Sequence, residues 1–132
     1  RSSARQNALL RLRWCSPTLG NSPAALGGYL SLSAALAKGA LGARTGERIA
    51  LAIAEINACD YCLAAHTYLG KNLAKLDDAE IAANRKGGSG DPKADAAVRF
   101  AVTVARERGH VSDVAVRAVK DAGHNRGDTC SV

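Results

Sequence analysis

The sequence predicts an all-α fold of about six helices in a single domain, and three observations support this prediction. Aromatic residues make up only 4% of the 132 residues and alanine is abundant, whereas strands favour β-branched and aromatic residues. Residues that cap helix starts and glycines that close helix ends alternate along the chain. No stretch carries a convincing strand pattern.

The first two helices are marked by capping residues. Ser22 can cap a helix whose first position is Pro23, and Gly39 closes that segment. Thr45 is expected to cap the next helix, a strongly apolar run from about 46 to 56. A buried strand is the competing interpretation of such a run, but its three alanines at alternate positions favour a helix.

Two further helices follow the same rules. One is expected to run from Cys59 to about Lys71. The other begins at Asp77, which forms a capping-box-like pair with Glu80 three residues later, and it ends at Gly87.

The last two helices follow a glycine-rich segment. The stretch "GGSGD" is expected to be a flexible loop. Asp91, followed by a proline, opens a helix that Gly109 ends. Ser112 caps one more helix, which runs to about Asp121 and is closed by a glycine two residues later.

The two ends of the chain do not follow this pattern. Residues 1–21 have weak helical periodicity, and residues 124–132 have no apolar periodicity at all. We therefore expect a domain over residues 22–123, flanked by an atypical N-terminal segment and an atypical C-terminal tail. Since the chain starts with arginine and the helical domain looks truncated, we expect a fragment or a processed form without a signal peptide.

Charge and composition disfavour several classes of protein. The net charge is +6, but four arginines and no acid lie in residues 1–21, and residues 22–123 hold 13 basic against 11 acidic residues. A nucleic-acid binder would usually carry a basic stripe in its folded part, so no nucleic-acid partner is expected. No run of about 18 apolar residues predicts a membrane span. Four cysteines, two of them at redox spacing, fit a reducing cytoplasm.

The stretch "AEINACDYCLAAH", residues 54–66, carries the candidate chemistry. A cysteine at a helix N-terminus has its thiolate stabilised by the helix dipole and free backbone N–H groups, which describes Cys59 if the helix begins there. Cys62 then lies about one turn further on, close enough for a disulfide. His66 shares a helix face with Cys62, so its neutral imidazole can accept and return a thiol proton.

Two other interpretations of this stretch are open. A closed zinc site needs four ligands, and the motif gives three. Each candidate for the fourth lacks a partner at ligand spacing, so no metal is expected and these residues are taken as bystanders: Cys15, His110, His124 and Cys130. The two cysteines of the motif can also be inert buried residues beside a surface histidine. Of the upstream carboxylates, spacing alone does not choose between Glu47 and Glu55.

The site residues form one combined pattern, in which a glutamate is followed by eleven residues and then by Cys-x-x-Cys-x-x-x-His. In this chain these residues are Glu47, Cys59, Cys62 and His66. Over residues 22–123 the chain resembles the carboxymuconolactone decarboxylase / AhpD-like alkylhydroperoxidase superfamily. The flanking stretches "ARTGERIALAIAE" and "CLAAHTYLGKNLAKL" resemble its peroxidase-related branch.

The resemblance implies an all-helical fold, homo-oligomers that are commonly trimers or hexamers, and thiol peroxidase chemistry without a cofactor, haem or metal. It implies Cys62 as the peroxidatic thiol, Cys59 as the resolving thiol and His66 as the proton acceptor. Glu47 becomes the relay carboxylate and thereby gains over Glu55. The substrate is then a hydroperoxide, and a dithiol reductant restores the pair.

This chain also departs from the family pattern. Tyr61 stands where the best-studied alkylhydroperoxidase branch has a second histidine. Tyr61 and Glu55 are secondary candidates for the site. The decarboxylase branch generally lacks the cysteine pair, so the pair disfavours that activity; a non-catalytic, redox-responsive oligomeric module is the other alternative. Family members continue past the position of Gly123 into another apolar helix, so we expect that helix to be missing. Our hypothesis is that both ends carry frame or gene-model errors, which resequencing of the locus tests.

Overall fold

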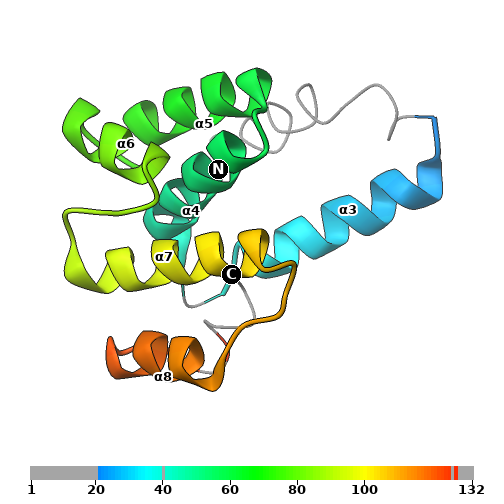
Figure 1. Ribbon diagram of the computed structural model, residues 1–132. Helices are drawn as coiled ribbons and strands as arrows, with labels where there is room; N and C mark the ends of the chain where they lie inside the picture. The colour runs from blue at the N-terminus through cyan, green and yellow to red at the C-terminus, as the bar shows by residue number, and fades with distance from the viewer. Residues whose placement is uncertain (1–20, 40, 126, 128–132) are drawn as a thin grey trace. The chain divides into compact units, whose positions relative to one another are not determined.

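The predicted all-α class is confirmed. A computed structural model describes residues 21–39, 41–125 and 127, and these residues form six helices and no strand (Figure 1). The helices are α3 Pro23–Leu36, α4 Gly42–Ile56, α5 Asp60–Asn72, α6 Asp78–Arg85, α7 Pro92–Arg106 and α8 Asp113–Asp121. The predictions for residues 1–20 and 128–132 lie outside the described residues. No helix in the described ranges is long and apolar enough to cross a membrane.

The chain divides into two compact units, Arg1–Ala37 and Lys38–Val132. Helix α3 belongs to the first unit and starts as predicted, because the Ser22 hydroxyl accepts a hydrogen bond from the Ala25 amide at 3.3 Å. It is rich in apolar residues, yet none of its residues is buried. Helices α4 to α8 form the second unit, which contains all of the candidate site.

The prediction that Thr45 caps the second helix is wrong. Helix α4 begins at Gly42, and its N-cap, Leu41, makes no side-chain capping bond. The intervening Ala43 and Arg44 are good helix formers, so the helix begins about one turn earlier than predicted. The Arg44 guanidinium also donates to the Lys75 carbonyl at 3.4 Å, which ties the first turn to the segment after α5. A contact over 31 residues of sequence could not be predicted from local capping signals.

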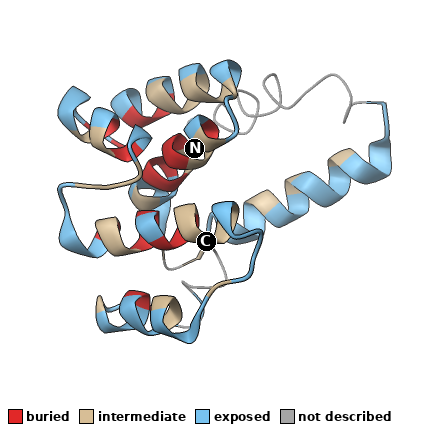
Figure 2. Cartoon of the chain, viewed as in Figure 1, coloured by how far each residue is buried: buried red, intermediate tan, exposed pale blue. Residues whose placement is uncertain are grey.

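Helix α4 is the centre of the second unit (Figures 1 and 2). It lies between α5 and α6 on one side and α7 on the other, and α8 packs on α7. One face of α4 packs on α7 through buried aliphatic side chains, namely Ile49, Ala52, Ala97, Val98 and Ala101. Another face brings Leu51 against the segment after α5 and against α6, with Ala74, Leu76 and Ile81. Because several faces of α4 are covered, two of its charged side chains, Glu47 and Arg48, are also buried.

The glycine-rich loop between α6 and α7 is more strongly bonded than a flexible loop would be. The Ser89 amide donates to Asp95 Oδ1 at 2.8 Å and the Gly90 amide to Glu80 Oε2 at 2.9 Å. The Asp91 amide donates to the Ser89 hydroxyl at 3.2 Å. Carboxylates from α6 and α7 therefore hold the loop, and glycine supplies the left-handed turn at Gly87, where φ is 82°.

The capping-box prediction at the start of α6 is half right. Asp77 caps the helix, since its Oδ1 accepts from the Glu80 amide at 2.7 Å. The Glu80 side chain instead contacts Arg48 of α4, whose Nε lies 2.8 Å from Glu80 Oε1. The Arg48 N–H is not aligned with that oxygen, so this buried contact is chiefly electrostatic.

Glu80 is held in its ionised form. Burial alone would raise its pKa, but hydrogen bonds from Ser89, Asn84 and the Gly90 amide, together with the charge of Arg48, lower the pKa from 4.5 to about 2. The shift is large because each of these partners favours the charged carboxylate.

Acid should therefore destabilise the protein in a defined pH window. The folded-state pKa of Glu80 is depressed, so its contribution to stability is complete above pH 4.5 and is lost as the pH falls toward about 2. Since solvent screens part of the interaction, we expect a loss of about 1–2 kcal/mol in the free energy of unfolding. Thermal unfolding of the wild type and Glu80→Gln between pH 6 and pH 2 measures it. An equally steep pH dependence in Glu80→Gln would contradict this prediction.

Candidate functional site

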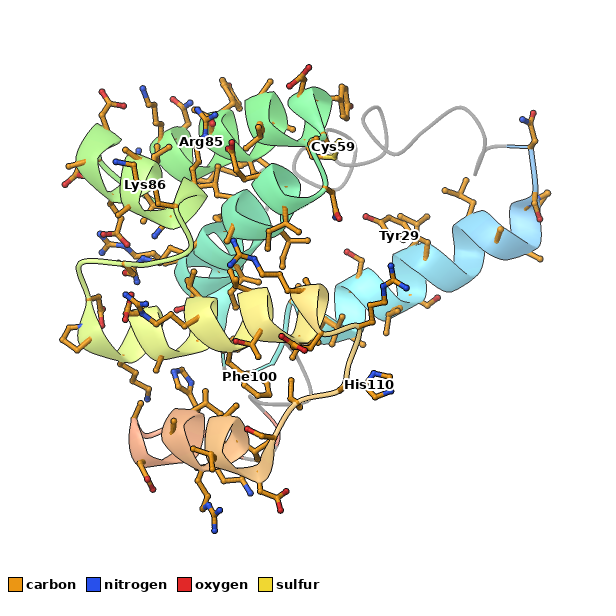
Figure 3. The ribbon with its side chains drawn as sticks, viewed as in Figure 1. Tyr29, Cys59, Arg85, Lys86, Phe100 and His110 are labelled. Atoms are coloured by element: carbon orange, nitrogen blue, oxygen red, sulfur yellow. A yellow bond between two sulfur atoms is a disulfide. The ribbon has the colours of Figure 1, made fainter. Side chains whose placement is uncertain are left out.

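A short turn joins α4 to α5 and places the start of the cysteine motif beside the end of α4. Helix α4 ends at Ile56 with Asn57 as its C-cap, and Ala58 adopts a left-handed conformation with φ of 49°. The Cys59 amide donates to the Ala54 carbonyl at 3.0 Å, which closes the turn. Asn57 and Ala58 thus form the break between the two helices. Figure 3 shows Cys59 at this junction.

Cys59 and Cys62 are joined as a disulfide, with Cα atoms 5.2 Å apart. Cys59 is the N-cap of α5, and its Sγ accepts a hydrogen bond from the Cys62 amide at 3.2 Å. Both residues are half-buried. When the pair is reduced, the Cys59 sulfur occupies a position where the helix dipole and a backbone N–H favour a thiolate.

His66 is paired with a buried carboxylate. Its Nδ1 lies 2.7 Å from Glu47 Oε2, and the Glu47 side chain is only 7% exposed, against 29% for His66. Since a carboxylate can only accept, the neutral ring carries its hydrogen on Nδ1 and leaves Nε2 as an acceptor. Helical spacing puts His66 on the face of α5 that carries Cys62. The arrangement can hold a base one turn from a thiol.

The two upstream carboxylates are separated by the structure. Glu47 contacts His66, whereas Glu55 points outward and forms an ion pair with Arg85 of α6, with 2.7 Å between Glu55 Oε2 and Arg85 Nε. The Glu55 side chain is 41% exposed. The secondary candidate Glu55 is therefore not brought to the cysteine pair.

Tyr61, the other secondary candidate, is 44% exposed on the first turn of α5. Successive helix residues diverge by about 100°, so Tyr61 does not share the face of Cys62 and His66. A tyrosine at this position leaves Glu47 and His66 as the carboxylate–imidazole pair of the site.

The residues taken as bystanders lie elsewhere. His110 is exposed, with Nδ1 3.2 Å from the Glu107 carbonyl oxygen. His124 is buried, and its Nε2 donates to the Lys93 carbonyl at 2.9 Å. The prediction for Cys15 and Cys130 falls outside the described residues. In the ranges that the structure describes, no group of three or more His, Cys, Asp or Glu is placed to hold a metal ion.

Sequence reasoning missed the buried polar group that adjoins the site. Arg48 follows Glu47 directly and is 6% exposed, and the sequence predicts for its partner Glu80 only a part in a helix cap. The available signal was a pair of opposite charges immediately before the apolar run of α4. This local pattern does not identify Glu80, 32 residues further along the chain, as the partner of Arg48.

The comparisons with known proteins agree with this frame. The model of the carboxymuconolactone decarboxylase family matches residues 23–107, which includes α3 to α7 and every residue of the candidate site. A search of the curated proteins finds no match.

Proposed function

Because the chain belongs to the carboxymuconolactone decarboxylase family, we propose that it is a thiol peroxidase of the alkylhydroperoxidase type, which reduces organic hydroperoxides through Cys59 and Cys62. The observation that carries this proposal is the cysteine pair at the start of α5, one turn before a histidine held by a buried carboxylate. A redox pair and a proton acceptor are the groups that a metal-free peroxidase needs.

The proposed cycle begins with proton transfer. His66 Nε2, its ring oriented by Glu47, takes the proton of the Cys62 thiol. The thiolate attacks the O–O bond of the hydroperoxide, which breaks to give a sulfenic acid on Cys62 and an alkoxide that recovers the proton from His66 as an alcohol. Cys59, as its thiolate, then attacks the sulfenic sulfur, the disulfide forms, and hydroxide leaves and is protonated to water.

A dithiol reductant completes the cycle. One of its thiolates attacks the Cys59–Cys62 disulfide, its second thiol resolves the mixed disulfide, and the reductant leaves oxidised. We further propose that the chain works as a homo-oligomer in the cytoplasm and that residues 22–123 make up the working domain. These proposals rest on family membership and on the intracellular use of a redox cysteine pair.

A second candidate is a non-catalytic, redox-responsive oligomeric module. Tyr61 favours it, because a tyrosine between the cysteines offers no second imidazole to the proton relay. Such a module would oxidise and reduce its disulfide without turning over hydroperoxide. A carboxymuconolactone decarboxylase-type activity is less well supported, since lactone chemistry has no use for a disulfide pair.

One experiment tests these proposals together. The purified protein is mixed with cumene hydroperoxide and dithiothreitol, hydroperoxide consumption is followed, and the metal content of the same sample is measured. Turnover that survives removal of metal, and that disappears in Cys62→Ser, supports the peroxidase. Reversible oxidation of the pair without turnover supports the module, and stoichiometric zinc that a chelator removes supports a structural metal site instead. A family member with established hydroperoxide turnover is run alongside as a positive control.

A further inference from the structure

Two adjacent residues of α4 carry opposite charges and are both buried. Glu47 and Arg48 are each 6% exposed, and among the described residues no other acidic or basic side chain besides His124 falls in the buried class. Consecutive helix positions diverge by about 100°, so the two side chains reach different neighbours. Glu47 contacts His66 of α5, and Arg48 contacts Glu80 of α6.

Glu80 is built into its position as a fixed anion. Its carboxylate accepts from the Ser89 hydroxyl at 2.5 Å, the Gly90 amide at 2.9 Å and Asn84 Nδ2 at 3.0 Å. Asn84 is fully buried, and the same Nδ2 donates to the Gly88 carbonyl at 2.8 Å. Two acceptors on Nδ2 fix the orientation of this amide, so the whole group is rigid.

A buried guanidinium cannot lose its proton and therefore needs a carboxylate. The structure offers Arg48 one close partner, Glu80, and a more distant one, Asp91, whose Oδ2 lies 3.7 Å from Arg48 Nη1. Among the described residues, Glu47 is the one carboxylate in the buried class, and it is the residue before Arg48 in the same helix. If Glu80 were uncharged, Arg48 would keep only Asp91 at 3.7 Å, and we expect its positive charge to act more strongly on the neighbouring Glu47.

We propose that Arg48 is a positioning residue for the Glu47–His66 pair, and that Glu80 neutralises Arg48 so that the charge of Glu47 stays directed at His66. The catalytic consequence rests on the proposed function, because it concerns how well His66 can hold a proton during the reaction. The electrostatic coupling that we propose between the Glu47–His66 pair and the Arg48–Glu80 pair does not depend on that function.

The other charged groups on the elements around His66 are exposed. On α4, Arg44 donates to the Lys75 carbonyl and Glu55 pairs with Arg85 of α6. On α5 and α6, Lys71 pairs with Asp78 across the two helices. Water and salt screen such exposed groups, so their effect on the imidazole is small compared with that of buried charges.

The test follows the ring resonances of His66 by NMR during a pH titration of the disulfide form, without any hydroperoxide. A His66→Gln variant assigns the resonance among the three histidines of the chain. Glu80→Gln leaves Arg48 unneutralised, so the midpoint of the His66 titration should fall by about one pH unit, the scale expected for losing one buried charge. Arg48→Met removes the positive charge, so the midpoint should rise.

The opposite signs distinguish this role from a purely structural one. The double variant Arg48→Met/Glu80→Gln should return toward the wild-type midpoint, and Glu55→Gln, which removes the carboxylate of the exposed α4–α6 ion pair, should leave it unchanged. Equal shifts in one direction, or no shift in either single variant, would overturn the proposal. If Arg48→Met does not fold, the comparison of Glu80→Gln with Glu55→Gln decides alone. Because no turnover is measured, a failed peroxidase assay leaves this result intact.

Discussion

Replacing Cys62 with serine is expected to abolish hydroperoxide turnover, by at least about 10³-fold, because the nucleophile of the proposed cycle is removed. Cys59→Ser should also slow steady-state turnover, since the Cys59–Cys62 disulfide cannot form and the sulfenic acid must react with the reductant directly. It should nevertheless form one equivalent of sulfenic acid on Cys62 when hydroperoxide is added. Trapping the sulfenic acid with dimedone and measuring the adduct by mass spectrometry separates the two variants.

The opposite labelling pattern would reverse the assignment of the two thiols. The capping position of Cys59, with its Sγ accepting from the Cys62 amide, favours a thiolate on Cys59. The proximity in sequence of His66 to Cys62 on one helix face favours proton removal from Cys62. A dimedone adduct on Cys62→Ser but not on Cys59→Ser would mean that the helix terminus outweighs the base.

Glu47→Gln is expected to lower kcat/KM for cumene hydroperoxide by about 10²-fold, within the range measured for general acid–base groups. The amide cannot stabilise the protonated imidazole of His66, although it keeps the shape of the side chain. Glu55→Gln is the matched control, because the same chemical change is made on the same helix at an exposed ion pair. Its kcat/KM should stay within about twofold of the wild type.

Two outcomes would contradict that prediction. Equal losses in Glu47→Gln and Glu55→Gln would point to destabilisation of α4 rather than to the relay. An unchanged kcat/KM in Glu47→Gln would remove the carboxylate from the cycle. Thermal unfolding of both variants is measured in parallel, so that a lower fraction of folded protein is not mistaken for slower chemistry.

The helix starts could be predicted where the signal is local. Ser22, Asp77, Asp91 and Ser112 all act as N-caps, and each accepts from an amide two or three residues further along the chain. The start of α4 could not be predicted in this way, since Thr45 is an acceptable cap by sequence but lies inside the helix. Its extra turn is accompanied by a contact to Lys75.

The candidate site likewise has a part that could be predicted from local sequence and a part that could not. The positions of Cys59, Cys62 and His66 relative to one another follow from helical spacing within a single element. The choice of Glu47 over Glu55 depends on how α4 is rotated against α5, which only packing determines. The contact between Arg48 and Glu80 could not be predicted from the sequence for the same reason, since the two residues lie on different helices.

Cys59 is both a member of the redox pair and the cap of a helix, and these two roles are thermodynamically linked. Its sulfur belongs to the redox pair and also caps the first turn of α5. Reduction replaces a neutral disulfide sulfur at that cap with one that can carry a negative charge, which the turn stabilises. Whatever strengthens the start of α5 therefore favours the reduced state, and whatever frays it favours the oxidised state. The tendency of the cysteine pair to accept electrons therefore depends on the stability of the first turn of α5.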